Sequence, residues 1–169
     1  MFPRVNTLLA VAFAILLSAS LVSAQRAKAP KVIIDTDFNT IFDDGQAAVM
    51  AAQLHSKGVI NLLGFTVASG NAWRDQEVVE CLKAVERLGL EQSVKVYVGA
   101  QYPLLHDFKS HLHEQLLFGP PIDYVGAYAG PQPSPNDLVP PSDGFAQHTK
   151  PAHEDAVDFI IETIAIPMK

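Results

Sequence analysis

Three short apolar runs separated by helical patterns constrain the fold of this chain more than any other feature. The runs, residues 32–35, 59–67 and 94–98, are rich in Val, Ile and Leu, as buried strands are. Residues 44–56 and 73–88 lie between them and place apolar side chains at three- and four-residue intervals. Parallel strands need crossover helices, so this alternation predicts an α/β fold: a mostly parallel, Rossmann-like sheet with helices on both faces.

The second half of the chain has a weaker pattern. Residues 104–118 and 153–166 each predict a helix, and eight of the twelve prolines fall in residues 119–151, which predicts a long irregular loop. Cys81, the single cysteine, lies among the apolar residues of the second predicted helix, so we expect a buried small hydrophobe. Trp73 begins that helix, and we expect it to pack rather than to stack on a ligand.

The N-terminal residues have the pattern of a secretory signal peptide. Arg4 gives a positive start, residues 8–17 are apolar, and small residues precede Gln25. The apolar stretch is shorter than the roughly 20 residues of a membrane span. We therefore expect a secreted protein with a signal peptide at residues 1–24, one domain at residues 25–169, and no membrane anchor in the mature form.

The charge balance argues against several classes of partner. The formal net charge is −6, and because the predicted signal peptide carries one Arg and no acid, the remainder carries −7. No stripe of Lys and Arg occurs, which argues against nucleic acid and anionic membranes as partners. The sequence leaves the oligomeric state open, and a homo-oligomer is compatible with it.

Four carboxylates follow the first predicted strand within ten residues: Asp35, Asp37, Asp43 and Asp44. The carboxyl end of a strand in an open α/β sheet is where ligands bind. Like charges repel one another unless a cation lies among them, and a hard divalent cation prefers oxygen ligands. The alternative is that Asp43 or Asp44 caps the next helix, although one cap accounts for only one of the four acids.

The acid cluster resembles a family signature. Residues 32–37 (VIIDTD), a five-residue insert and the Asp43-Asp44 pair resemble the signature of the inosine/uridine-preferring nucleoside hydrolases. Three further segments resemble later parts of the same family: residues 66–71 (TVASGN), 96–100 (VYVGA) and 156–161 (AVDFII). The resemblance extends over residues 31–166, nearly all of the predicted mature chain.

This resemblance implies an enzyme that uses water and a bound Ca²⁺ ion to cleave the N-glycosidic bond of ribonucleosides, through an oxocarbenium-like state. It implies that Asp37 is both a metal ligand and the catalytic base, and that Asp44 is a second metal ligand. It also implies that Asp43 and Asn71 bind the ribose hydroxyls, with Asp35 as a nearby supporting carboxylate.

The sequence also departs from the family pattern. A Gly-Pro-Leu-Thr-Asn-like segment, which supplies one calcium ligand in the family, has no counterpart here, nor has a C-terminal Asp with its neighbouring His. Asp37 and Asp44 would then be the remaining protein ligands of an ion that takes about 6–8 oxygens. We therefore expect a truncated domain with impaired hydrolysis. The alternative is a noncatalytic secreted protein of the same fold that binds ribosides or a protein partner.

Overall fold

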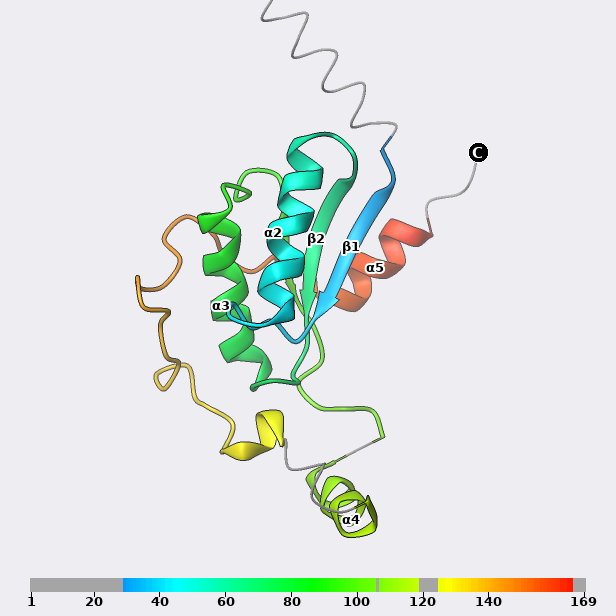
Figure 1. Cartoon of the computed structure of the whole chain (residues 1–169), viewed down its shortest axis with the longest axis vertical. Coiled ribbons are helices and arrows are strands. Elements are labelled where there is room, and N and C mark those ends of the chain that lie inside the picture. Colours follow the sequence, from blue (N-terminus) through cyan, green and yellow to red (C-terminus); the bar gives the residue numbers. More distant parts are fainter. Residues whose placement is uncertain (1–28, 106, 119–124, 166–169) are drawn as a thin grey trace, which may run out of the picture.

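The computed structural model describes residues 29–105, 107–118 and 125–165 (Figure 1). The expected signal peptide, residues 1–24, lies outside these ranges. In the described ranges, no helix combines the length and the apolar character that crossing a membrane requires.

Three parallel strands form an open sheet in the order β1-β2-β3. They are β1 (Lys31–Thr36), β2 (Asn61–Val67) and β3 (Lys95–Val98). β2 begins two residues later than the apolar run predicts, because the Val59 and Ile60 N–H groups both bond to the Leu54 carbonyl and complete the preceding helix end. The parallel topology confirms the predicted fold class.

Two helices cover one face of the sheet: α2 (Asp43–Ser56) and α3 (Arg74–Arg87). Both are followed by a glycine in the left-handed region, Gly58 at φ 70° and Gly89 at φ 65°, which ends the helix without a steric cost. The small buried alanines of α2 allow it to approach the strands closely. The largest core cluster lies here, and its most buried side chains are Phe38, Leu62, Phe65, Val67, Cys81, Val85, Val94 and Val96.

The opposite face is covered by α5 (Ala156–Ile164). This helix begins later than predicted because Asp155 is its N-cap and accepts the N–H groups of Val157 and Asp158 at 2.8 and 2.9 Å. Tyr97 of β3 and Phe159 of α5 stack with ring centroids 3.7 Å apart. Helices therefore lie on both faces, as predicted.

The remaining segments lie outside these layers. The helix α4 (Phe108–Phe118) lies beyond the carboxyl ends of the strands, away from the sheet (Figure 1). The predicted irregular loop, residues 119–151, contains a short 3₁₀ helix, η2 (Gly126–Ala129), after which the chain runs along the outer side of α3. Arg87 of α3 pairs with Asp143 and holds the loop there.

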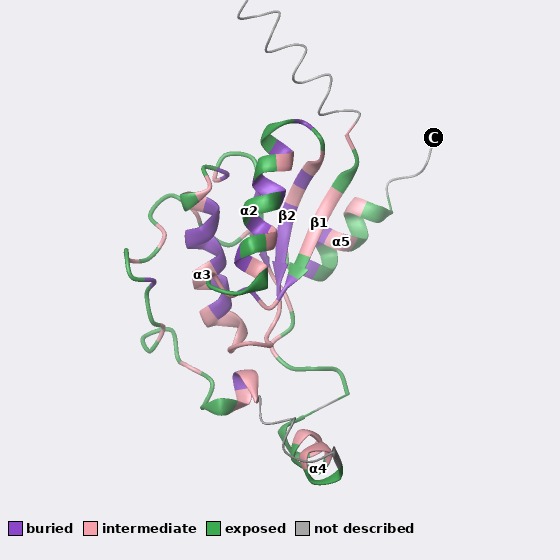
Figure 2. Ribbon diagram, in the orientation of Figure 1, coloured by how far each residue is buried: buried purple, intermediate pink, exposed green. Residues whose placement is uncertain are grey.

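Cys81 confirms its predicted structural role. Its side chain has no exposed surface, and burial raises the pKa of the thiol well above its ordinary value. Figure 2 shows the buried residues gathered on the inner sides of α2 and α3 and along β2. A neutral, inaccessible thiol of this kind acts as core packing.

Candidate active site

The loop after β1 is fixed to the core by Phe38, the residue that follows Asp37. The Phe38 ring is 1% exposed and packs edge to face on Phe65, with the ring centroids 6.2 Å apart. At the end of β1, the Thr36 hydroxyl donates a hydrogen bond to Asp44 Oδ1. The two anchors hold Asp37 and Asp44 at the same end of the sheet.

Asp43 and Asp44 are the first two residues of α2, but neither of them caps it. The N-cap is Phe42, and no side chain makes a capping hydrogen bond there. The capping interpretation is therefore wrong. Both charges lie at the positive end of the helix dipole, which stabilises them. Asp43 is exposed, whereas Asp44 is partly buried and its Oδ2 accepts the Asn39 N–H at 3.4 Å.

The loop after β2 brings a third polar side chain to the same place. Asn71 Nδ2 donates to the Asp37 carbonyl oxygen at 2.7 Å and lies 3.4 Å from Asp44 Oδ2. Gly70 approaches Asp37 so closely that a Cβ atom at Gly70 would overlap the Asp37 carboxylate. The structure thus brings together Asp37 and Asn71, from the loops after β1 and β2, and Asp44, from the first turn of α2.

Asp35 lies apart from this group. Side chains alternate along a strand, so Asp35 and Thr36 point to opposite faces of β1. Asp35 Oδ1 accepts a hydrogen bond from the Thr66 hydroxyl at 2.5 Å, on the α5 side of the sheet. Asp44 belongs to α2 on the other side. A supporting role for Asp35 at the site stays a prediction.

Burial and neighbouring negative charges both act on the Asp37 carboxyl group. Burial raises the pKa of the Asp37 carboxyl above its usual range, and the charges of Asp44 and Asp43 raise it further. A perturbed carboxylate in a cleft is typical of a functional site.

Glu77 of α3 is a further acid that the sequence interpretation missed. Its side chain is 1% exposed, and its Oε1 accepts the Ala72 N–H at 2.5 Å. Burial, followed by repulsion from Asp37 and Asp44, raises the pKa of Glu77 to about 8. The sequence did carry a signal: Glu77 precedes Cys81 by four residues and so lies on the apolar stripe of its helix.

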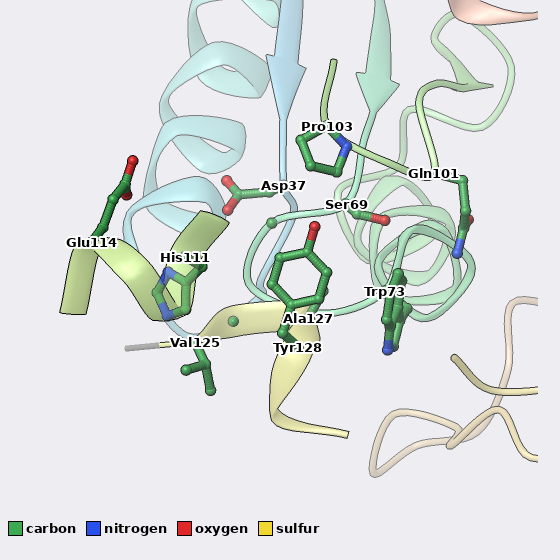
Figure 3. Close-up of a pocket in the computed structure, with 12 residues that line it drawn as sticks. Asp37, Ser69, Trp73, Gln101, Pro103, His111, Glu114, Val125, Ala127 and Tyr128 are labelled. Atoms are coloured by element: carbon green, nitrogen blue, oxygen red, sulfur yellow. The ribbon is translucent and has the colours of Figure 1, made fainter. Parts of the chain in front are cut away.

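A cleft of about 360 Å³ lies beside Asp37 (Figure 3). Asp37, Ser69 and Gly70 line it from the loops that end β1 and β2, and Trp73 lines it from the start of α3. The other lining residues come from the second half of the chain and are Gln101, Pro103, His111, Glu114, Val125, Gly126, Ala127 and Tyr128.

Aromatic side chains hold the cleft wall together. Trp73 packs edge to face on Tyr102 and Tyr128, with ring centroids 6.0 and 5.7 Å away, and its Nε1 donates to the Gly130 carbonyl at 2.9 Å. The prediction that Trp73 packs is confirmed, and the same ring also lines the cleft. Local sequence patterns did not predict His111 or Tyr128 as residues that line the cleft, because long-range contacts bring them there.

The donor set fits part of a site for a hard cation. Asp37 and Asp44 offer carboxylate oxygens, the ligand type that Ca²⁺ and Mg²⁺ prefer, and a positive charge between them would relieve the repulsion described above. Over residues 29–105, 107–118 and 125–165, no group of three or more His, Cys, Asp or Glu side chains is arranged to hold a metal ion. Asp37 and Asp44 are therefore a pair of acids without a third acidic, His or Cys side chain placed to share a metal ion in these ranges.

The open parallel sheet and the acid-lined cleft at its strand ends define an α/β protein of the kind that binds ligands at this edge. The chain belongs to the inosine-uridine preferring nucleoside hydrolase family, whose model matches residues 32–169. This confirms the resemblance described above, and the family is one of metal-dependent hydrolases that act on nucleosides.

Among solved structures, the chain is similar to type III effector protein XopQ complexed with adenosine diphosphate ribose. The sequence identity is 22% and the TM-score 0.49; the match covers 89% of this chain and 37% of that one. This chain therefore corresponds to little more than a third of that protein's length. No curated protein matches the sequence.

Proposed function

We propose that this chain takes part in the hydrolysis of the N-glycosidic bond of ribonucleosides, in a Ca²⁺-dependent reaction at the cleft beside Asp37. The observation that carries this proposal is the convergence of Asp37, Asp44 and Asn71 at the strand ends, where Asp37 lines the cleft, in a chain of the nucleoside hydrolase family. Ca²⁺ is the ion that the resemblance to the family implies, and carboxylate oxygens are ligands that it prefers.

Asp37 is the catalytic base in this proposal. It lines the cleft and accepts a proton from the attacking water. Burial raises the pKa of Asp37, which makes its carboxylate a stronger base than an exposed aspartate. Asp37 and Asp44 also hold the divalent cation, which supplies, when bound, the charge that orients water and makes it more acidic.

Asp43 and Asn71 bind the ribose hydroxyls in this proposal. Asp43 is exposed at the first residue of α2, and Asn71 lies on the neighbouring loop beside Asp37. The negative side chains around the sugar favour the positive charge that develops on it as the glycosidic bond breaks. Asp35 supports the site indirectly by joining β1 to β2 through Thr66.

We further propose that hydrolysis by this 169-residue chain is slow. Among the described residues, Asp37 and Asp44 provide few of the about 6–8 oxygens that Ca²⁺ takes, and a shell completed largely by water binds the ion weakly. The same observation favours a second candidate function, a noncatalytic protein of this fold that binds ribosides or a protein partner.

Release of ribose from inosine and uridine, with added Ca²⁺ and with a chelator, tests the proposal. We expect slow release that requires Ca²⁺, is lost in Asp37→Asn and is kept in Asp137→Asn, a control in the exposed loop. Release that Asp37→Asn leaves unchanged would contradict the assignment of the base. Riboside binding without any release would favour the noncatalytic function.

We also propose that the protein is secreted after removal of residues 1–24. The support is the signal-peptide pattern of the sequence. Expression in a secreting host followed by N-terminal sequencing should give a product that begins at Gln25. Retention of an intact N-terminus inside the cell would contradict secretion.

A further inference from the structure

Two carboxylates of α3 contact the two loops that form the candidate active site. Glu80 Oε2 accepts a hydrogen bond from the Thr40 hydroxyl at 2.6 Å, in the loop after β1. Glu77 Oε1 accepts the Ala72 N–H at 2.5 Å, in the loop after β2. Residues three apart lie on the same side of a helix, so α3 presents one acid to each loop.

Glu77 is the more unusual of the two acids, because its side chain is 1% exposed. Its second oxygen, Oε2, has no hydrogen-bond partner within the part of the chain that the structure describes. A buried carboxyl group of this kind costs free energy compared with an apolar residue of the same size. Packing alone therefore does not account for a glutamate at this position.

The turn that Glu77 holds leads directly to the site. The Gly70 N–H bonds to the Ala72 carbonyl at 3.1 Å and closes a short turn around Asn71. Asn71 in turn donates to the Asp37 carbonyl, and Gly70 lies against the Asp37 carboxylate. A displacement of this turn would therefore move both the Asn71 amide and the Asp37 side chain.

We propose that Glu77 is a positioning residue of this site: it fixes the turn of Gly70, Asn71 and Ala72 to α3 and thereby sets the places of Asn71 and Asp37. The chemistry of the site rests on the proposed function above. The positioning of the turn by Glu77 does not depend on that function. An error of about 1 Å in the placement of a catalytic group can cost about a hundredfold in rate, so this anchor matters for any chemistry at the cleft.

Three variants of the full chain separate the role of Glu77 from a merely structural one. Glu77→Gln keeps the length and an oxygen acceptor for the Ala72 N–H, and Glu77→Leu keeps the bulk but removes the acceptor. Glu91→Leu is the matched control, because Glu91 also has a carboxylate oxygen without a partner in the described ranges, but it lines a separate cavity of about 250 Å³ near the start of β3.

Amide hydrogen exchange of residues 69–73 measures directly how firmly the turn is held. Loss of the acceptor in Glu77→Leu should speed exchange there by about tenfold or more, because the Ala72 N–H is left without its hydrogen-bond partner. Glu77→Gln and Glu91→Leu should exchange like the wild type. Equal exchange in wild type and Glu77→Leu would overturn the proposal. Should Glu77→Leu not fold, fast exchange in a folded Glu77→Gln would overturn it equally.

Terbium luminescence measures cation binding at the site itself. Trp73 is the single tryptophan and lines the same cleft as Asp37, so excitation of its ring reports Tb³⁺ bound there. We expect Glu77→Leu to weaken Tb³⁺ binding by about tenfold, with Glu77→Gln and Glu91→Leu close to the wild type. Unchanged affinity in Glu77→Leu would overturn the link to Asp37. If the wild type binds no Tb³⁺, the cation part of the proposed function fails, and the exchange experiment alone decides the role of Glu77.

Discussion

The Asn71 side chain donates a hydrogen bond to the backbone carbonyl of Asp37 at 2.7 Å and so joins the loop after β1 to the loop after β2. The two residues are 34 positions apart in sequence, and parallel pairing of β1 with β2 is what brings them together. The arrangement of the site therefore depends on the register of these two strands. A short amide side chain spans the gap only if that register is kept.

Asn71→Ala should weaken both the fold and the site. The Asp37 carbonyl loses its partner, which costs about 0.5–1.5 kcal/mol for an ordinary hydrogen bond. Urea unfolding should show this loss, and the Tb³⁺ affinity should fall because Asp37 and Asp44 both lose a contact with Asn71. Asn136→Ala, in the exposed loop, is the control and should change neither quantity. An unchanged urea midpoint in Asn71→Ala would show that the bond carries no net stability.

Gly70→Ala should disturb the site more than the fold. A methyl group at Gly70 would overlap the Asp37 carboxylate, so the side chain or the turn has to move. Overpacking of this kind costs about 1–3 kcal/mol, and here the displaced group is the proposed base. Gly130→Ala is a matched control, because a Cβ atom there meets nothing within 4 Å. Ribose release and Tb³⁺ binding should fall in Gly70→Ala alone, and equal values in both variants would contradict the prediction.

Local patterns in the sequence were enough to predict the strands, α2, α3 and α5, because apolar periodicity and helix-ending glycines act over a few residues. The same patterns placed Asp37 and Asp44 at the strand ends. They did not place His111 and Tyr128 in the cleft wall, because long-range packing decides those positions. Glu77 was missed for a related reason: the role of an acid on an apolar stripe depends on which loop packs against it in the folded chain.

Variants of Asp35 and Thr66 test whether Asp35 stabilises the sheet or belongs to the cation site. Thr66 is completely buried and donates its hydroxyl to Asp35, so Asp35→Ala leaves a buried hydroxyl without its acceptor, at a cost of about 1–3 kcal/mol. Thr66→Val removes the hydroxyl, and the double variant should recover part of the loss in urea unfolding. Tb³⁺ affinity should fall only slightly, because the pair lies on the α5 side of the sheet and supports the site indirectly. A large fall in affinity in Asp35→Ala would instead make Asp35 part of the cation site.

Glu77 should make the stability of the protein depend on pH. Burial and the neighbouring acids raise its pKa from 4.5 to about 8, so between these values the folded chain holds a proton that the unfolded chain has released. The free energy of unfolding therefore falls as the pH rises through this range, and the contribution is lost above about 8. Glu77→Gln cannot titrate, so the decline in its urea midpoint with pH should be smaller than in the wild type when both are measured in a chelator. Glu91→Gln, outside the site, is the control and should follow the wild type. Parallel plots of urea midpoint against pH for all three proteins would show that Glu77 is ionised throughout.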